Sequence, residues 1–164
     1  MENLTSVYLS GGEVLEDVHF FRQEAFKENP DYCFCSADTI ARDLKKLSVE
    51  NAEFQAVESG KTYQFNINDR LNGLLLNGLI QLGMVDKEQP VTFDYDNQFV
   101  KAEKYDATYS YKKAFGYFPG IAQINLHPFY IENRDGNANV KFEQAETLER
   151  AFAQLKANGI RVVS

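Results

Sequence analysis

The sequence predicts a mixed α+β or α/β protein, in which a helical N-terminal region precedes a mixed sheet built in the order β-β-β-α-β. Apolar residues recur at helical spacing as far as about residue 47, three strand-like runs follow residue 90, and a last helical run leads into a final strand-like run. We therefore expect residues 1–60 to form the helical region and residues 61–164 to form the sheet, whose fourth strand is cut short.

The composition is that of a globular protein without a membrane span. Hydrophobic residues make up 44% of the chain, charged residues 25% and aromatic residues 13%, which together argue against disorder. No apolar run approaches the length of a bilayer-spanning helix, and no basic segment followed by an apolar one marks a secretory signal. We expect a cytoplasmic protein that makes no membrane contact.

The charge of the chain is unevenly distributed. The net charge is −7, whereas a chain that binds DNA alone is more often basic. Residues 1–90 hold 8 Lys and Arg against 15 Asp and Glu, and residues 91–164 hold 9 of each. The acidity therefore belongs to the first part, and any DNA role is expected to depend on further segments or partners.

Two helices are predicted in the N-terminal region. The first spans residues 13–27 and ends before Pro30, and the second begins at Ser36, whose hydroxyl can cap its first turn. The pair is compatible with a helical hairpin or, less commonly, with a DNA-reading helix-turn-helix. The positions at helical spacing are Val14, Val18, Phe21 and Ala25 in the first helix and Ile40, Leu44 and Leu47 in the second.

A strand and a leucine-rich helix follow. Residues 61–67 alternate toward β structure, and Asn66 or Asn68 can cap the helix after them. Gly73 and Gly78 lower the helix propensity, so we expect a neighbouring element to approach closely at these two positions. The apolar residues at helical spacing are Ile67, Leu71, Leu74, Leu75, Leu79 and Leu82.

Three strands are predicted after Pro90. They span residues 91–96, 117–125 and 128–133, with a turn near His127-Pro128 between the last two. Residues 134–137 have the composition of a turn, in which Gly136 is expected to adopt a positive φ.

A helix and a last strand complete the chain. The helix begins near Glu143 and stops at Asn158-Gly159, because glycine suits a left-handed cap. Glu146 and Arg150 are spaced to form an ion pair at i, i+4. Ile160 then begins the fourth strand. The predicted apolar stripe of the helix is Ala145, Leu148, Phe152 and Leu155.

The strand over residues 91–96 carries two acids on one face. Side chains alternate along a strand, so Asp94 and Asp96 point one way while Phe93 and Tyr95 point the other. Mg²⁺ commonly binds through one or two carboxylates, and a pair of such ions supports phosphoryl transfer. The two acids are therefore candidate metal ligands and catalytic residues, with a merely solvent-facing strand as the alternative.

The segment after this strand interleaves tyrosines with lysines. Aromatic rings stack on unpaired bases and lysines neutralise phosphates, so the segment suits a distorted or single-stranded DNA end. An exposed loop with tyrosines used for packing is the alternative. The candidate DNA-binding residues are Lys104, Tyr105, Tyr109, Tyr111, Lys112 and Lys113.

From about Ser36 onward the chain resembles a DDE-type insertion-sequence transposase of the kind found in bacterial genomes. The segments that carry the resemblance are 93–97 (Phe-Asp-Tyr-Asp-Asn), 104–106 (Lys-Tyr-Asp), 111–113 (Tyr-Lys-Lys), 116–120 (Gly-Tyr-Phe-Pro-Gly), 132–140 (Glu-Asn-Arg-Asp-Gly-Asn-Ala-Asn-Val) and 144–150 (Gln-Ala-Glu-Thr-Leu-Glu-Arg).

This resemblance implies a ribonuclease-H-like catalytic domain in which two aspartates and a glutamate hold Mg²⁺ or Mn²⁺. Such enzymes cut transposon ends and join them to target DNA. The first aspartate maps onto the acidic strand. Family members place Ser or Thr after it, which favours Asp96 over Asp94, although Asn97 stands there in this chain. The second aspartate is expected beyond Val163 and the glutamate further on, so we expect an N-terminal fragment that is inactive alone.

A second hypothesis comes from a different class of protein. Residues 1–85 could form an acidic helical platform of a non-catalytic protein-interaction module, because the negative charge and the leucine-rich helix both lie there. Under either hypothesis the unpaired edge of the last strand predicts self-association, and hence a homodimer formed by strand pairing.

Overall fold

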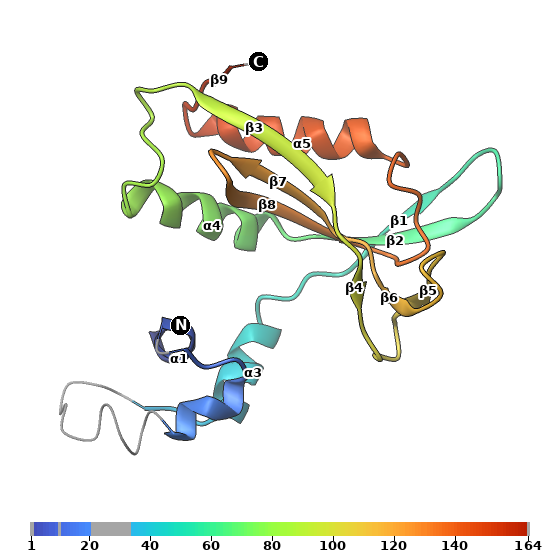
Figure 1. Cartoon of the computed structure of the whole chain (residues 1–164). Coiled ribbons are helices and arrows are strands. Elements are labelled where there is room, and N and C mark those ends of the chain that lie inside the picture. Colours follow the sequence, from blue (N-terminus) through green and yellow to red (C-terminus); the bar gives the residue numbers. More distant parts are fainter. Residues whose placement is uncertain (1, 10, 21–33, 164) are drawn as a thin grey trace. The chain divides into compact units, whose positions relative to one another are not determined.

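The computed structural model describes residues 2–9, 11–20 and 34–163 of the chain, which divides into two compact units, residues 1–48 and 49–164 (Figure 1). The division falls twelve residues before the boundary expected at residue 60, so the first strand belongs with the sheet.

The first unit is helical, as predicted. It contains α1 (Glu2–Leu9), the 3-10 helix η1 (Leu15–Asp17) and α3 (Ala37–Lys45). The hydroxyl of Ser36 accepts a hydrogen bond from the Thr39 amide at 3.2 Å, which confirms the predicted cap. Of the predicted helix over residues 13–27, residues 15–17 form η1 and residues 18–20 are helical, whereas residues 21–27 lie outside the described part of the chain. The buried side chains of the unit are Val7, Val18, Ala37 and Ile40.

The second unit contains a curled mixed sheet with few helices, which confirms the mixed α+β class (Figure 1). The strands run in the order β1-β2-β8-β7-β3-β9, and β4, β6 and β5 form a separate small sheet. All paired strands are antiparallel except β3 and β9, which are parallel. The elements are β1 (Ala52–Gln55), β2 (Thr62–Ile67), α4 (Asp69–Gln81), β3 (Val91–Asn97), β4 (Val100–Lys101), β5 (Thr108–Tyr109), β6 (Phe115–Tyr117), β7 (Gly120–Ile124), β8 (His127–Arg134), α5 (Gln144–Ala157) and β9 (Val162–Val163).

The β7–β8 hairpin turns two residues earlier than predicted. Asn125 and Leu126 both adopt positive φ (49° and 68°), as a two-residue hairpin turn requires, while the sequence signal of Pro128 falls within β8. A register shift follows between Ala122 and Gln123, which leaves Phe129 as the extra residue of β8. This irregularity explains why the adjacent residues Phe129 and Tyr130 are both buried in the same core.

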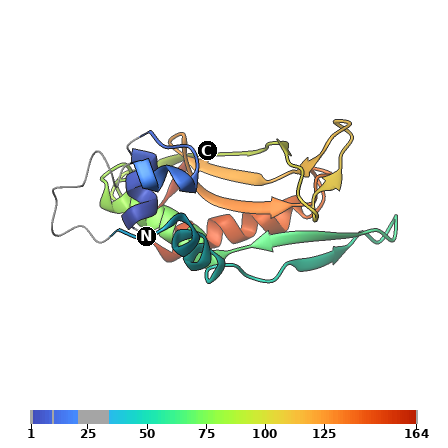
Figure 2. The same cartoon turned by 90° about the horizontal axis from the view of Figure 1, so that it is seen from below.

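Helix α5 covers one face of the sheet. The ring of Phe93 on β3 stacks on Phe152 of α5, with centroids 4.5 Å apart and an interplanar angle of 29°. Figure 2 shows α5 running along one side of β7 and β8. The buried stripe of α5 is Thr147, Ala151 and Leu155, so the predicted stripe was correct at Leu155 but wrong at Ala145, which is exposed.

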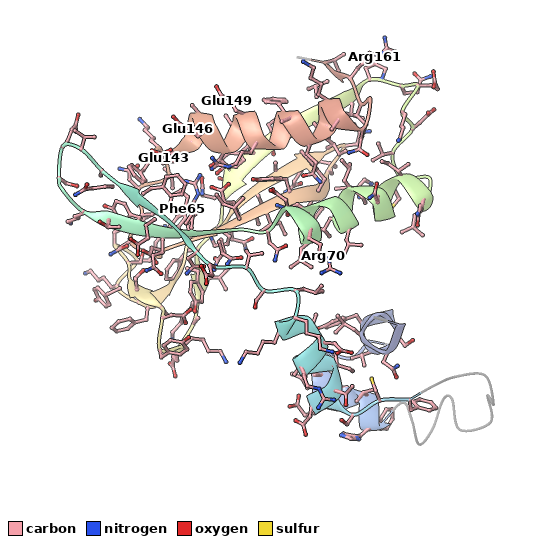
Figure 3. All side chains as sticks on the ribbon, turned by 180° about the vertical axis from the view of Figure 1, so that it is seen from behind. Phe65, Arg70, Glu143, Glu146, Glu149 and Arg161 are labelled. Atoms are coloured by element: carbon pink, nitrogen blue, oxygen red, sulfur yellow. The ribbon has the colours of Figure 1, made fainter. Side chains whose placement is uncertain are left out.

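A buried ionic network lies between β8 and α5. The carboxylate of Glu132, fully buried, accepts a hydrogen bond from the guanidinium of Arg150 at 3.0 Å and lies 3.6 Å from that of Arg134. The Thr147 hydroxyl also donates to Glu132 at 2.8 Å. The predicted Glu146–Arg150 pair is therefore wrong: Figure 3 shows Glu146 on the side of α5 that faces away from the sheet, and Arg150 turns inward to Glu132.

Helix α4 lies along the edge of β8, where β2 has ended. The Asn72 amide, which is buried, donates to the Ile131 carbonyl at 3.1 Å and accepts from the Ile131 N–H at 3.0 Å. Asn68 caps the helix by accepting from the Leu71 amide at 3.0 Å, one of the two predicted caps. A Cβ at Gly73 or Gly78 meets no atom within 4 Å, so the predicted close approach was wrong for the described residues.

The face of α4 that packs differs from the stripe of leucines read in the sequence. Leu76 is fully buried, and Leu79 and Ile80 pack against the same core. Because the helix lies beside a strand edge, only this narrow side is covered. The leucines left exposed are Leu71, Leu74, Leu75 and Leu82. Among the helices that the structure describes, none is long and apolar enough to cross a bilayer.

Candidate functional site

The two acids of β3 lie on the face of the sheet opposite α5. Phe93 and Tyr95 contact the core beneath α5, so the alternation of the strand turns Asp94 and Asp96 to the other face, where both are exposed. One carboxylate oxygen of each acid accepts the N–H of the following residue, at 2.9 Å for Asp94 and 2.8 Å for Asp96. The second oxygen of each carboxylate points to no hydrogen-bond partner described in the structure, and is available to a ligand.

A small lobe, residues 100–117, follows β3 and holds the three-stranded sheet β4-β6-β5 (Figure 1). The backbone approaches closely at two glycines, between the lobe and the segment after β8 at Gly136, and within the lobe at Gly116. A Cβ at Gly136 would lie 2.3 Å from the carbonyl oxygen of Gly116, and one at Gly116 would lie 2.2 Å from that of Val100. Gly136 does not adopt the predicted positive φ; close backbone approach is what requires glycine there.

A hydrogen bond inside the lobe fixes its outer loop. The hydroxyl of Tyr117 donates to the Asp106 carboxylate at 2.6 Å. Desolvation by burial, together with this hydrogen bond and the negative charge of Asp106, raises the pKa of Tyr117 to about 12. The phenol therefore stays protonated at neutral pH and keeps the loop attached to β6.

A tight turn between β5 and β6 displays Tyr111 and Lys112. The buried Ser110 accepts the Lys112 N–H on its side-chain oxygen at 3.3 Å, and Lys113 adopts a positive φ of 58°. The Tyr111 ring stacks on Phe118, with centroids 5.8 Å apart and an angle of 27°. The Lys112 ammonium lies 5.0 Å from the centre of the Tyr111 ring, within the range of a cation–π contact.

The acidic strand and the lobe share a pocket of about 450 Å³, which we call the β3 pocket. Its lining combines three aromatic rings, one carboxylate, one ammonium and several amides. The structure thus brings together Asp96, Tyr111 and Lys112, which the sequence analysis selected for separate reasons. The lining residues are Asp96, Asn97, Gln98, Phe99, Tyr111, Lys112, Phe118, Ile121 and Gln123.

The remaining predicted site residues lie outside this lining. Asp94 is one pleat away from Asp96 along the same face and faces Gln123 across the β3–β7 ladder. Tyr109 packs against Phe115 at 5.2 Å elsewhere on the lobe. Lys104, Tyr105 and Lys113 are exposed on its loops, and Tyr105 is fully so.

Gln98 and Gln123 line the pocket but were not selected from the sequence. Gln123 sits in the run Gly-Ile-Ala-Gln-Ile, where a single polar residue is unremarkable. The register of β7 against β3 puts Gln123 opposite Asp94, and that register is a long-range property. An amide in an otherwise apolar central strand is the only local signal that pointed to it.

The donor atoms near β3 fit a hard cation only in part. Among the described residues no group of three or more His, Cys, Asp and Glu gathers to hold a metal. The candidate metal ligands on β3 are Asp96 and Asp94, and each has one carboxylate oxygen that accepts no hydrogen bond described in the structure. Mg²⁺ needs no more than one or two carboxylates and keeps several waters, so these residues fit one half of a site.

Comparison with known proteins gives no relatives. No protein-family model matches the chain, and no curated protein and no solved structure matches it either.

Proposed function

We propose that this chain is the first part of a ribonuclease-H-like catalytic domain of a DDE-type transposase, which cuts and joins DNA with the help of divalent cations. The observation that carries the proposal is the meeting of Asp96 with Tyr111 and Lys112 at the β3 pocket. An acid that can hold a cation, a ring that can stack on a base and an ammonium that can neutralise a phosphate are what a DNA-cleaving site needs side by side.

The strand order supports the same proposal. Apart from the lobe strands β4, β5 and β6, which lie between β3 and β7, the chain order is β3, β7, β8, α5 and β9, and β9 pairs with β3 in parallel on the side away from β7. The resemblance to transposases implies this arrangement, because a second acidic strand has to lie beside the first. Val162 and Val163 pair with Val91 and Thr92, so a continuation of β9 would run past Asp94 and Asp96.

Asp96 is the better candidate for the first metal ligand. It lines the β3 pocket and Asp94 does not, and the resemblance also favours Asp96. Bound metal ions would supply activation of the attacking oxygen and stabilisation of the leaving oxygen of a phosphodiester. Lys112, at the rim of the same pocket, would neutralise a neighbouring phosphate, and Tyr111 would hold an unstacked base. A second aspartate and a glutamate are implied outside this sequence.

Isothermal titration with Mn²⁺ and Mg²⁺ tests the assignment of β3. We expect measurable binding to the wild-type chain, a large loss in Asp96→Ala, a smaller loss in Asp94→Ala and no binding in the double variant. The matched control is Glu58→Ala, an exposed acid on the β1–β2 hairpin, which we expect to bind like the wild type.

Two outcomes would contradict the proposal. Metal affinity that survives the loss of both acids would show that β3 is not the metal strand. Divalent-dependent DNA nicking by this chain that disappears in Asp96→Ala would show that the chain is already a complete nuclease and not an N-terminal part.

A second candidate function, a non-catalytic protein-interaction module, is favoured by one observation. The outer side of α4 exposes Leu74 and Leu82, at 50% and 75% of their surface. Exposed apolar side chains in a group are typical of protein contacts. A gel shift at low salt separates the classes: binding to DNA that is lost in Lys112→Ala/Lys113→Ala supports the transposase, and indifference to DNA supports the module.

A further inference from the structure

The β3 pocket has the shape and chemistry of a site for a flat heteroaromatic ligand. Its volume of about 450 Å³ lies within the range of roughly 300–1,000 Å³ found for small-ligand sites. One wall is preformed by the stacked rings of Tyr111 and Phe118, and Phe99 lies against Phe118 at 5.9 Å. Phe118 is 4% exposed and therefore held by its own packing, and it gives the exposed Tyr111 a fixed ring to stack on.

The rest of the lining, apart from Ile121, is polar. Gln98 and Gln123 bring side-chain amides, each able to donate and to accept hydrogen bonds, and Asp96 adds a carboxylate that only accepts. Amides of this kind match the donor and acceptor edges of nucleobases. The pocket therefore offers a stacking surface together with groups that can bind the edge of a base.

The Lys112 ammonium adds a positive charge that suits the phosphate of a nucleotide. The Lys112 ammonium stands over the Tyr111 ring, and its partner there is a neutral aromatic face. It is exposed and free to move toward a phosphate attached to a base that occupies the pocket. A free aromatic compound without an anionic group would leave this cation unused.

We infer that the β3 pocket takes one unpaired nucleobase of a DNA strand, stacked on Tyr111, contacted at its edge by Gln98 and Gln123, and with its phosphate next to Lys112. The inference rests on the proposed function for the choice of DNA as ligand. A base inside a duplex is covered on both faces and paired at its edge, so only an unstacked base can enter. The chain is therefore expected to prefer single-stranded or frayed ends to intact duplex.

Binding of fluorescein-labelled oligonucleotides to the whole chain tests the inference, with EDTA present so that no metal contributes. We expect single strands to bind at least about tenfold more tightly than a duplex of the same sequence. Tyr111→Ala should weaken single-strand binding by about tenfold, as is typical for loss of one base-stacking ring, and Tyr111→Phe, which keeps the ring, should stay within about twofold of the wild type.

A control residue separates the pocket from the surface of the lobe. Phe115, on β6 of the lobe, is 55% exposed and does not line the pocket, so Phe115→Ala should change single-strand and duplex binding by the same small factor. Gln123→Ala should alter the order of affinities for short homopolymers of the four bases. Equal losses in Tyr111→Ala and Phe115→Ala, or duplex binding as tight as single-strand binding, would overturn the inference.

A spectroscopic measurement reports on the base itself. An oligonucleotide with a single 2-aminopurine should change its fluorescence on binding to the wild type and to Tyr111→Phe, and not on binding to Tyr111→Ala. Both variants replace a side chain that is 68% exposed, so the fold, checked by circular dichroism, should be retained. An unchanged signal with the wild type would also overturn the inference.

The two proposals fail in distinguishable ways. If the acids of β3 bind no metal but the preference for single strands still depends on Tyr111, the base pocket stands and the nuclease does not. If metal binding depends on Asp96 but Tyr111→Ala has no effect on DNA, the nuclease stands and the base pocket does not.

Discussion

Glu132 is the residue on which the packing of α5 onto β8 depends most directly. Its carboxylate is fully buried and faces two guanidinium groups, those of Arg134 and Arg150. Arg134 is itself buried against the Phe65 ring, 4.5 Å from its centre. A buried ion pair adds little compared with apolar packing, but removing one partner leaves an uncompensated charge behind.

We therefore expect Glu132→Gln to lower the free energy of unfolding by about 3–5 kcal/mol, because Arg134 is left buried without its counter-charge. Urea denaturation followed by circular dichroism measures the change. Glu146→Gln, on the outer side of α5, is the control and should stay within about 0.5 kcal/mol of the wild type. A larger effect of Glu146→Gln would show that Glu146 does form the ion pair with Arg150 that the sequence predicted.

At the residue scale, local periodicity predicted some features and missed others. The alternation of β3 correctly put Asp94 and Asp96 on one face, because a strand has a fixed period of two. The same local reasoning predicted the wrong ion-pair partner for Arg150, because i, i+4 spacing considers only residues on the same helix. Its partner Glu132 lies 18 residues away on β8, and a contact between two elements is not reported by the spacing within one helix.

At the element scale, the positions of α3, α4 and α5 were predicted, whereas α1 was not, and the buried sides of α4 and α5 were predicted only in part. The extents of α4 and α5 follow from leucine spacing and from caps at Asn68 and Gly159, which are local signals. The buried side of α4 could not be read, because leucines occupy most of its circumference and the strand edge that it covers is distant in sequence. A polar residue, Asn72, proves to mark the inward side.

The glycines of α4 and of the lobe are expected to respond oppositely to alanine. Gly73→Ala should raise the free energy of unfolding by about 0.5–1 kcal/mol, because the new Cβ meets no atom and the helix gains propensity. Gly136→Ala should lower it by about 1–3 kcal/mol, because the Cβ would collide with the backbone of Gly116. Thermal or urea unfolding of both variants measures the pair.

Destabilisation by Gly73→Ala would mean that another element covers α4 at this point, as the sequence had led us to expect. A neutral Gly136→Ala would mean that the lobe shifts away from β8 at little cost. The binding of single-stranded DNA by that variant would then show whether the lobe position matters to the β3 pocket.

At the scale of the whole molecule, the sheet has an open edge at β9. Among the residues that the structure describes, this strand pairs with β3 alone, and the Val163 side chain is 46% exposed. An exposed apolar edge strand invites pairing with another chain. We expect the protein to dimerise in the micromolar range through β9, which sedimentation velocity over a concentration series would detect.

Val163→Lys should shift this equilibrium toward monomer, because a charged residue on an edge strand opposes pairing. Val57→Lys, at the tip of the β1–β2 hairpin, where the side chain is 96% exposed, is the matched control and should leave the dimer intact. A strictly monomeric wild type at all concentrations would contradict the prediction.

The side-chain amide of Asn72 has a consequence for the aggregation of this protein. It donates and accepts the hydrogen bonds that a strand residue would exchange with Ile131, the first residue of β8 beyond its pairing with β2. A strand from another molecule therefore finds no unpaired backbone group at Ile131 with which to extend the sheet. Asn72→Leu would leave the N–H and the carbonyl of Ile131 unpaired, and intermolecular strand pairing would become possible at that position.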